Sequence, residues 1–223
     1  MSINLTPRLL AVASLVRGGS IIADIGTDHG YLPIYLIETG KVPSAIAADI
    51  GRMPLENARK SVEECGLSDK IELRLSDGLQ NFKATDVREI VFAGMGGTLI
   101  AEKLSEILWV KDESLHFVFQ PQSRAEDLRE FLFSNGYSIG EEIATHEGRR
   151  SYITFDAVYK GQTKRFTPAE CFIGKLPHNE DAHNHLRKQS ARLQKKHDAL
   201  KAAGEDVSVL SEIITAIQEF IND

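Results

Sequence analysis

Short apolar runs alternate with amphipathic segments along the first 135 residues. Helices are predicted at about 7–17, 31–39, 54–65 and 123–135, each closed by a glycine. Buried strands separated by helices form βαβ units, so the pattern predicts a parallel sheet with helices on both faces. The predicted strands are 21–25, 45–50, 71–75, 90–93 and 115–119.

The pattern changes after Gly136. Runs 137–146 and 151–159 are strand-like, and the short loop between them predicts an antiparallel hairpin. The sheet is therefore expected to begin parallel and end antiparallel.

A further change follows Gly161. After a short helical or turn segment at 167–174, two helices are predicted at 179–203 and 207–221. Their three-residue connection predicts an antiparallel helical hairpin. Leucines seven residues apart in the first helix are typical of a narrow, coiled-coil-like seam. We expect a catalytic domain over 1–160 and this helical hairpin within 161–223.

The composition fits this division. A chain of 223 residues, 42% hydrophobic and 26% charged, is expected to form one domain plus a small appendage. No run approaches the ~20 apolar residues of a membrane span, and the first residues lack a signal-peptide pattern. Two cysteines are too few for a disulfide framework or a thiolate zinc site. We expect a cytoplasmic monomer that binds neither a metal nor a membrane.

Charge is unevenly distributed. The net charge of −6 excludes a uniformly basic, nucleic-acid-binding surface but permits a local basic patch. All of the net charge lies in 1–160, whereas 161–223 carries nine acidic and nine basic residues. The first arm of the helical hairpin is basic and the second acidic. This sorting indicates either salt bridges between the arms or a surface that contacts a phosphate backbone.

The first predicted strand leads into a turn that suggests a nucleotide-like ligand. Gly26 and Gly30 allow a sharp bend and a close approach of the backbone to a ligand. Asp28 and Tyr31 occupy the second and third glycine positions of a dinucleotide fingerprint, and a carboxylate there would repel a pyrophosphate. This argues against NAD and FAD. S-adenosylmethionine instead carries a sulfonium and an ammonium group, which Asp24 or Asp28 could accompany.

The later strand ends extend this site. Asp49 lies where such folds bind ribose hydroxyls, and Asp77 could reach an adenine amino group with clearance from Gly78. Taken alone, each of these aspartates is more typical of a helix cap. A fourth element, the glycine-rich run 94–97, follows the fourth predicted strand. Four such elements at successive strand ends predict one S-adenosylmethionine site. Its expected cofactor-binding residues are Asp24, Gly26, Thr27, Asp28, His29, Gly30, Tyr31, Leu32, Asp49, Ile50, Asp77, Gly78, Gly94, Met95 and Gly96.

These motifs resemble those of class I S-adenosylmethionine-dependent methyltransferases and, more narrowly, the bacterial TrmK family. The similarity rests on 24–33, 48–50, 76–79 and 93–97, and on Thr6-Pro7-Arg8-Leu9. Residues 120–122 are similar to the family's Gln-Pro-Asn, with glutamine replacing the asparagine. The resemblance implies a seven-stranded Rossmann-like sheet and methylation of N1 of adenine 22 in tRNA.

The residues are compatible with a ring-nitrogen acceptor. Enzymes that methylate exocyclic amines often carry Asn/Asp-Pro-Pro-aromatic after the fourth strand, where this chain has a glycine-rich run at 94–97. Methyl transfer from a sulfonium depends mainly on alignment. We expect Asp24, Asp28 and Gln120 to steady the acceptor and its developing charge. A small-molecule methyltransferase and a non-catalytic RNA-binding protein are the alternatives.

N1 lies on the Watson–Crick edge, so the target adenine must be unpaired or extruded. Contacts to tRNA would come from basic residues that are otherwise ordinary surface charges, and Arg124, Arg149 and Arg150 are candidates beside the predicted set. The predicted tRNA-binding residues are Arg8, Arg52, Gln120, Pro121, Arg187, Lys188, Arg192, Lys195 and Lys196.

Overall fold

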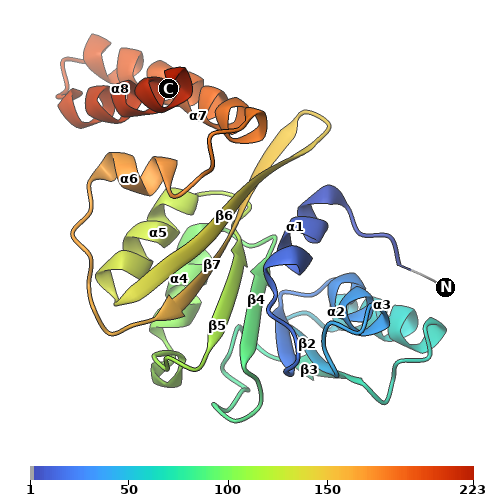
Figure 1. Cartoon of the computed structure of the whole chain (residues 1–223). Helices are drawn as coiled ribbons and strands as arrows, with labels where there is room; N and C mark the ends of the chain where they lie inside the picture. Colours follow the sequence, from blue (N-terminus) through green and yellow to red (C-terminus); the bar gives the residue numbers. More distant parts are fainter. Residues whose placement is uncertain (1–2) are drawn as a thin grey trace.

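The computed structural model describes residues 3–223 and contains one seven-stranded sheet (Figure 1). The strand order is β3-β2-β1-β4-β5-β7-β6, with β1 to β5 parallel and β7 antiparallel to both β5 and β6. The predicted Rossmann-like sheet with an antiparallel final pair is confirmed. The strands are β1 Ile22–Ile25, β2 Ala45–Asp49, β3 Ile71–Leu75, β4 Glu89–Ala93, β5 His116–Gln120, β6 Tyr137–Glu147 and β7 Arg150–Tyr159.

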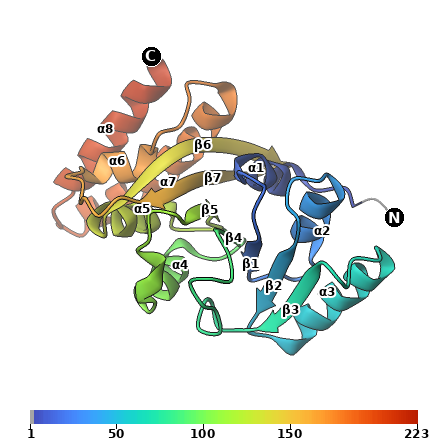
Figure 2. The same ribbon diagram turned by 60° about the horizontal axis from the view of Figure 1, so that its bottom comes forward.

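Helices cover both faces of the sheet (Figure 2). One core cluster joins apolar side chains of α1, α2 and α3 to alternate positions of the parallel strands. The other face packs against α4, α5 and the C-terminal helices. This two-sided burial is why the strands are almost continuously apolar. The helices flanking the sheet are α1 Pro7–Leu15, α2 Tyr31–Glu38, α3 Arg52–Glu64, α4 Gly97–Ser105 and α5 Ala125–Ser134, with a 3-10 turn at Leu108–Val110.

The C-terminal segment forms the predicted helical hairpin. α6 (Pro168–Ile173) leads into α7 (Glu180–Ala202) and α8 (Ser208–Asn222), and Figure 1 shows α7 beside the tip of the β6–β7 hairpin. Leu186 and Leu193 are buried in the same core cluster as the sheet. Within residues 3–223 no salt bridge joins α7 to α8, so the opposite charges of the two arms do not pair.

Several local features differ from the sequence prediction. α4 was not predicted, because its first turn begins in the glycine-rich run 94–97, which is typical of a loop. α3 begins at Arg52, two residues before Pro54, since a proline within the first turn removes no helical hydrogen bond. None of the helices within residues 3–223 combines the length and apolarity that crossing a bilayer requires.

Candidate functional site

The carboxyl ends of the parallel strands surround a cavity of about 300 Å³. It is lined by every residue predicted for the cofactor between Asp24 and Leu32, and by Gly94. Helix α1 contributes Arg8 and Leu9 to the same lining. The remaining predicted cofactor residues lie at neighbouring strand ends outside this lining: Asp49, Ile50, Asp77, Gly78, Met95 and Gly96.

The turn after β1 depends on glycine. Gly26 has φ +81°, and a Cβ there would lie 3.1 Å from the Met95 sulfur. Gly30 has φ +68° and is the N-cap of α2. Residues other than glycine rarely adopt these backbone angles, so the shape of the backbone around the cavity depends on glycine at both positions. Met95 therefore packs directly on the turn that carries the first motif.

Asp24 is an unusual carboxyl group. Its side chain is buried, with 6% of the residue exposed. Burial raises the pKa of Asp24 to about 6; a hydrogen bond with the Thr27 side chain opposes this, Asp49 adds to it, and Arg8 opposes it. Within residues 3–223 no salt bridge neutralises Asp24. The carboxylate is thus held in a place that favours a cationic ligand.

Two further carboxylates extend this negative region. Burial raises the pKa of Asp49, a hydrogen bond from the Gly51 N–H lowers it, and the charge of Asp28 raises it again. The Gly51 N–H meets Oδ1 of Asp49 at 2.6 Å, and Oδ2 has no hydrogen-bond partner within residues 3–223. One oxygen of Asp49 therefore remains open to a ligand hydroxyl.

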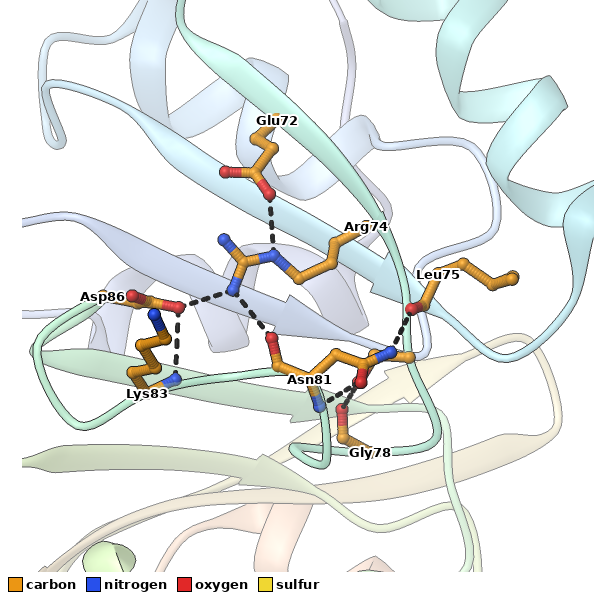
Figure 3. Close-up of polar contacts among 8 residues, drawn as sticks. Glu72, Arg74, Leu75, Gly78, Asn81, Lys83 and Asp86 are labelled. Atoms are coloured by element: carbon orange, nitrogen blue, oxygen red, sulfur yellow. Dashed lines mark hydrogen bonds and ion pairs between the residues drawn. The ribbon is translucent and has the colours of Figure 1, made fainter.

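A polar network fixes the loop that follows β3 (Figure 3). The Arg74 guanidinium donates to Glu72 at 2.7 Å and to Asp86 at 2.6 Å. It also donates to the carbonyl of Asn81 at 3.2 Å, and the Asn81 side chain donates to the Leu75 carbonyl at 2.8 Å. These contacts tie the loop back to its own strand, which positions Asp77 within it.

Asp77 has a partner that the sequence did not suggest. Lys103 Nζ of α4 donates to Asp77 Oδ2 at 2.9 Å, and only 9% of the lysine side chain is exposed. A Cβ on Gly78 would lie 2.9 Å from Cδ of Lys103. The clearance at Gly78 thus accommodates the lysine stem, whereas the sequence interpretation assigned it to an adenine. Lys103 could not have been found because α4 itself was not predicted.

Arg8, predicted to contact tRNA, lines the 300 Å³ cavity at the strand ends. Its Nη1 donates to Oε1 of Gln120 at 2.7 Å, and its guanidinium carbon lies 5.7 Å from the centre of the Tyr152 ring. Its backbone N–H donates to Glu147 at 2.8 Å. Gln120 is fully buried, and its amide donates to the Pro121 carbonyl at 3.2 Å. The Gln120 carbonyl predicted to accept from the substrate already accepts from Arg8.

Two large, exposed side chains lie at or near the cavity, Tyr31 in its lining and Ile50 outside it. Ile50, directly after Asp49, is 68% exposed, and Tyr31 is also exposed and stacks on His29 with ring centres 5.0 Å apart. Exposed apolar groups beside a polar cleft are typical of a binding site for a flat ligand.

The predicted tRNA-binding residues are spread over several surfaces. Pro121, Lys188 and Arg192 line a second cavity of about 410 Å³ beside the first. Arg187 pairs with Glu180 at 3.4 Å on α7. Exposed positions outside both cavities are Arg52, Lys195 and Lys196.

Comparison with known proteins shows which family the chain resembles. The family described as "Methyltransferase domain" matches residues 5–155. The tRNA (adenine(22)-N(1))-methyltransferase of Bacillus subtilis is 29% identical over 95% of this chain and 98% of its own length.

Solved structures agree over the whole length. A Streptococcus pneumoniae protein in complex with S-adenosyl-L-methionine is 32% identical, covers 98% of this chain and 100% of its own, and superposes with a TM-score of 0.85. The B. subtilis m1A22 tRNA methyltransferase TrmK is 27% identical over 98% of this chain and 99% of its own, with a TM-score of 0.83. The chain belongs to the TrmK family of S-adenosylmethionine-dependent tRNA (adenine-N1)-methyltransferases.

Proposed function

We propose that the protein transfers a methyl group from S-adenosylmethionine to N1 of adenine 22 in tRNA, with the residues around the 300 Å³ cavity holding the donor. The observation that supports this most is the agreement between two features. The chain matches a tRNA (adenine(22)-N(1))-methyltransferase almost end to end, and carboxylates gather at the strand ends around a glycine turn.

The cavity residues fit the chemistry of the donor. Asp24 and Asp28 would attract its cationic end, while Arg8 would meet its carboxylate. The open oxygen of Asp49 would accept from ribose hydroxyls, with the exposed Ile50 side chain against the adenine ring. Asp77 would accept from the adenine amino group. When bound, S-adenosylmethionine supplies a methyl group already activated by its sulfonium.

The acceptor side requires alignment without a strong base. N1 of adenine has a free lone pair in the ring plane, so no proton has to leave before the methyl group is transferred. Methylation adds positive charge to the base, which the buried Asp24 carboxylate would steady. Arg8 would position Gln120, because it holds the Gln120 carbonyl at 2.7 Å.

The C-terminal hairpin would act as a separate tRNA-contacting unit. We take 1–160 as the catalytic domain and 161–223 as the unit that carries the basic arm. Lys195 and Lys196 are exposed and form no salt bridge within residues 3–223. Replacing both with glutamine should flatten the dependence of log affinity for tRNA on log salt. An unchanged slope would make the arm purely structural.

The reaction itself is tested with labelled donor and unmodified tRNA. Digestion to nucleosides should give 1-methyladenosine and no N6-methyladenosine. A protein that binds the donor but leaves the tRNA unlabelled would be a non-catalytic binder. Label appearing only in small molecules of a cell extract would indicate the other enzymatic alternative.

A further inference from the structure

The second cavity, of about 410 Å³, is strongly basic. It lies between the segment after β5, the tip of the β6–β7 hairpin and the middle of α7. No carboxylate lines it, and its charged lining consists of five cationic side chains. These are Arg124, Arg149, Arg150, Lys188 and Arg192.

Part of this charge is neutralised from behind the lining. Arg124 pairs with Asp127 at 2.8 Å, and Arg192 approaches Glu126 at 3.7 Å. Lys188 Nζ donates only to the backbone carbonyl of Arg149, at 3.0 Å. The side chains of Arg149 and Arg150 form no salt bridge within residues 3–223. The cavity therefore keeps an excess of positive charge.

His185, which lines the basic cavity, is affected by the same positive charges. His185 Nδ1 lies 2.9 Å from the Ser151 hydroxyl oxygen, which ties α7 to the β6–β7 hairpin. Burial, together with the charges of Arg129, Lys188, His146 and Arg192, lowers the pKa of His185 to about 4. The imidazole is uncharged at neutral pH, so this wall offers a rigid polar surface among cations.

Arg124 stands at a strained backbone position. It has φ +57° and ψ +42° as the N-cap of α5, and it is the only non-glycine residue with positive φ in residues 3–223. This conformation favours glycine, so an arginine here costs stability. The α5 N-terminus lacks a side-chain cap, and its first turn already carries the carboxylates Glu126 and Asp127. The strain is understandable if the guanidinium serves a ligand.

The two cavities share a wall. Tyr152 lines the basic cavity, and its ring packs against Arg8, which lines the cofactor cavity. Pro121 of the basic cavity directly follows Gln120, which is hydrogen-bonded to Arg8. A ligand in the basic cavity would thus lie directly beside the place where a methyl acceptor must enter.

We propose that the basic cavity holds the backbone phosphate next to the adenine that is methylated, an assignment that rests on the proposed tRNA methylation. Arginine guanidinium groups match a phosphate with paired N–H donors. A base extruded into the cofactor cavity needs its backbone fixed close by, because unstacking it costs energy. The basic cavity would hold the backbone at a point separated from the donor only by the Tyr152–Arg8 contact.

The test compares tRNA binding with donor binding in full-length variants. Arg149→Gln/Arg150→Gln should raise KM for tRNA at least tenfold, with kcat within twofold and the Kd for S-adenosylmethionine unchanged. Its log KM should also depend less steeply on log salt, by about one unit. Arg149→Lys/Arg150→Lys should recover part of the loss. Lys70→Gln, an exposed charge before β3 on the opposite edge of the sheet, is the matched control.

Two further experiments test whether the effect on tRNA comes from a change in folding and which phosphate is contacted. Arg124→Gly should leave Tm within a few degrees of the wild type, because relief of the strained φ offsets the lost ion pair with Asp127, yet raise KM for tRNA several-fold. A tRNA with one uncharged methylphosphonate linkage beside the target adenine should raise KM for the wild type and add little in the Arg149/Arg150 double variant.

The outcomes distinguish the two proposals. If the wild type leaves tRNA unmethylated, the proposed function fails. If it methylates tRNA but the double variant matches Lys70→Gln in KM, the basic cavity does not hold phosphate. A methylphosphonate effect that is fully additive with the double variant places the contact at another phosphate and also overturns the assignment.

Discussion

Within the part of the chain that the structure describes, a buried charged side chain is paired at one end of the parallel strands and unpaired at the other; these ends are called the amino edge and the carboxyl edge of the sheet. At the carboxyl edge Asp24 is buried with no salt bridge within residues 3–223, and burial raises its pKa to about 6. At the amino edge a buried histidine lies between two carboxylates. His116 Nδ1 is 2.9 Å from Glu89, and its Nε2 is 2.9 Å from Asp156.

The amino edge is internally satisfied. Burial would lower the pKa of His116, but the hydrogen bonds with Asp156 and Glu89 outweigh it and raise the pKa. Burial would likewise raise the pKa of Asp156, yet the His116 bond and the Glu141 N–H hold it below its usual range. Glu89 also accepts from the Arg17 N–H at 2.7 Å. The charged groups of this edge are paired with one another, whereas Asp24 at the carboxyl edge has no salt bridge within residues 3–223.

Removing the histidine should give the largest effect. His116→Ala leaves Glu89 and Asp156 buried without their shared partner, so we expect a loss of about 3–5 kcal/mol in the free energy of unfolding. Urea titration at pH 6 measures it. His29→Ala, an exposed histidine at the opposite edge, is the control and should change stability by about 0.5 kcal/mol or less. Equal losses in the two variants would remove the distinction between the edges.

Asp24→Asn should stabilise the fold while damaging the site. A pKa raised from 3.8 to about 6 means that folding disfavours the charged form, so the neutral amide should gain roughly 2–3 kcal/mol at pH 8. The same change removes a charge that attracts the cationic donor, so its Kd should rise. Thermal unfolding and calorimetry measure the two effects. A variant that is destabilised at pH 8 would show that Asp24 is structural.

Asp49→Ala should act on the ligand alone. Losing charged hydrogen bonds to ribose hydroxyls costs about 1.5–3 kcal/mol of donor binding, or roughly 10- to 150-fold in Kd. The only hydrogen bond of its side chain within residues 3–223 is from the Gly51 N–H, so stability should fall by no more than about 1 kcal/mol. Asp69→Ala, an exposed carboxylate before β3, is the control. Unchanged donor affinity would remove Asp49 from the site.

The same contrast explains what the sequence could predict. Asp24, Asp49 and Asp77 could be predicted to lie together because each stands at or just after the end of a predicted strand, and parallel strands bring their carboxyl ends to one edge. The hairpin and the antiparallel pair followed from turn signals and periodicity. Glycine turns likewise marked the cofactor loop through local backbone requirements alone.

Contacts between distant segments carried no such signal. His116 lies 27 residues from Glu89 and 40 from Asp156, and nothing local marks the three as partners. Lys103 comes from a helix hidden by a glycine-rich start, and Arg8 reaches Gln120 from 112 residues away. A side chain's partner depends on packing in three dimensions, so the contact between Arg8 and Gln120 could not be predicted from the sequence.

The smallest expected effect is the pH dependence that His116 adds at the amino edge, in a window separate from that of Asp24. Asp24 binds a proton more tightly when folded, so its contribution to stability falls as pH rises from about 4 to about 6. His116 also has a raised pKa, so its contribution is complete below pH ~6.5 and is lost as pH rises through the raised value. That change is small because burial and hydrogen bonding oppose each other.

Subtracting the stability profile of each variant from that of the wild type isolates its group and the carboxylates it contacts, since all the others cancel. Asp24→Asn should remove a slope confined to the acid window. His116→Gln should remove a slope above pH ~6.5 and also the acid-window slope of Asp156, whose pKa His116 lowers. If Asp24→Asn also changes the slope above pH ~6.5, the edges titrate as one coupled network. The unpaired aspartate would then be part of the structural charge pairing, and its exposure to a ligand would no longer explain its raised pKa.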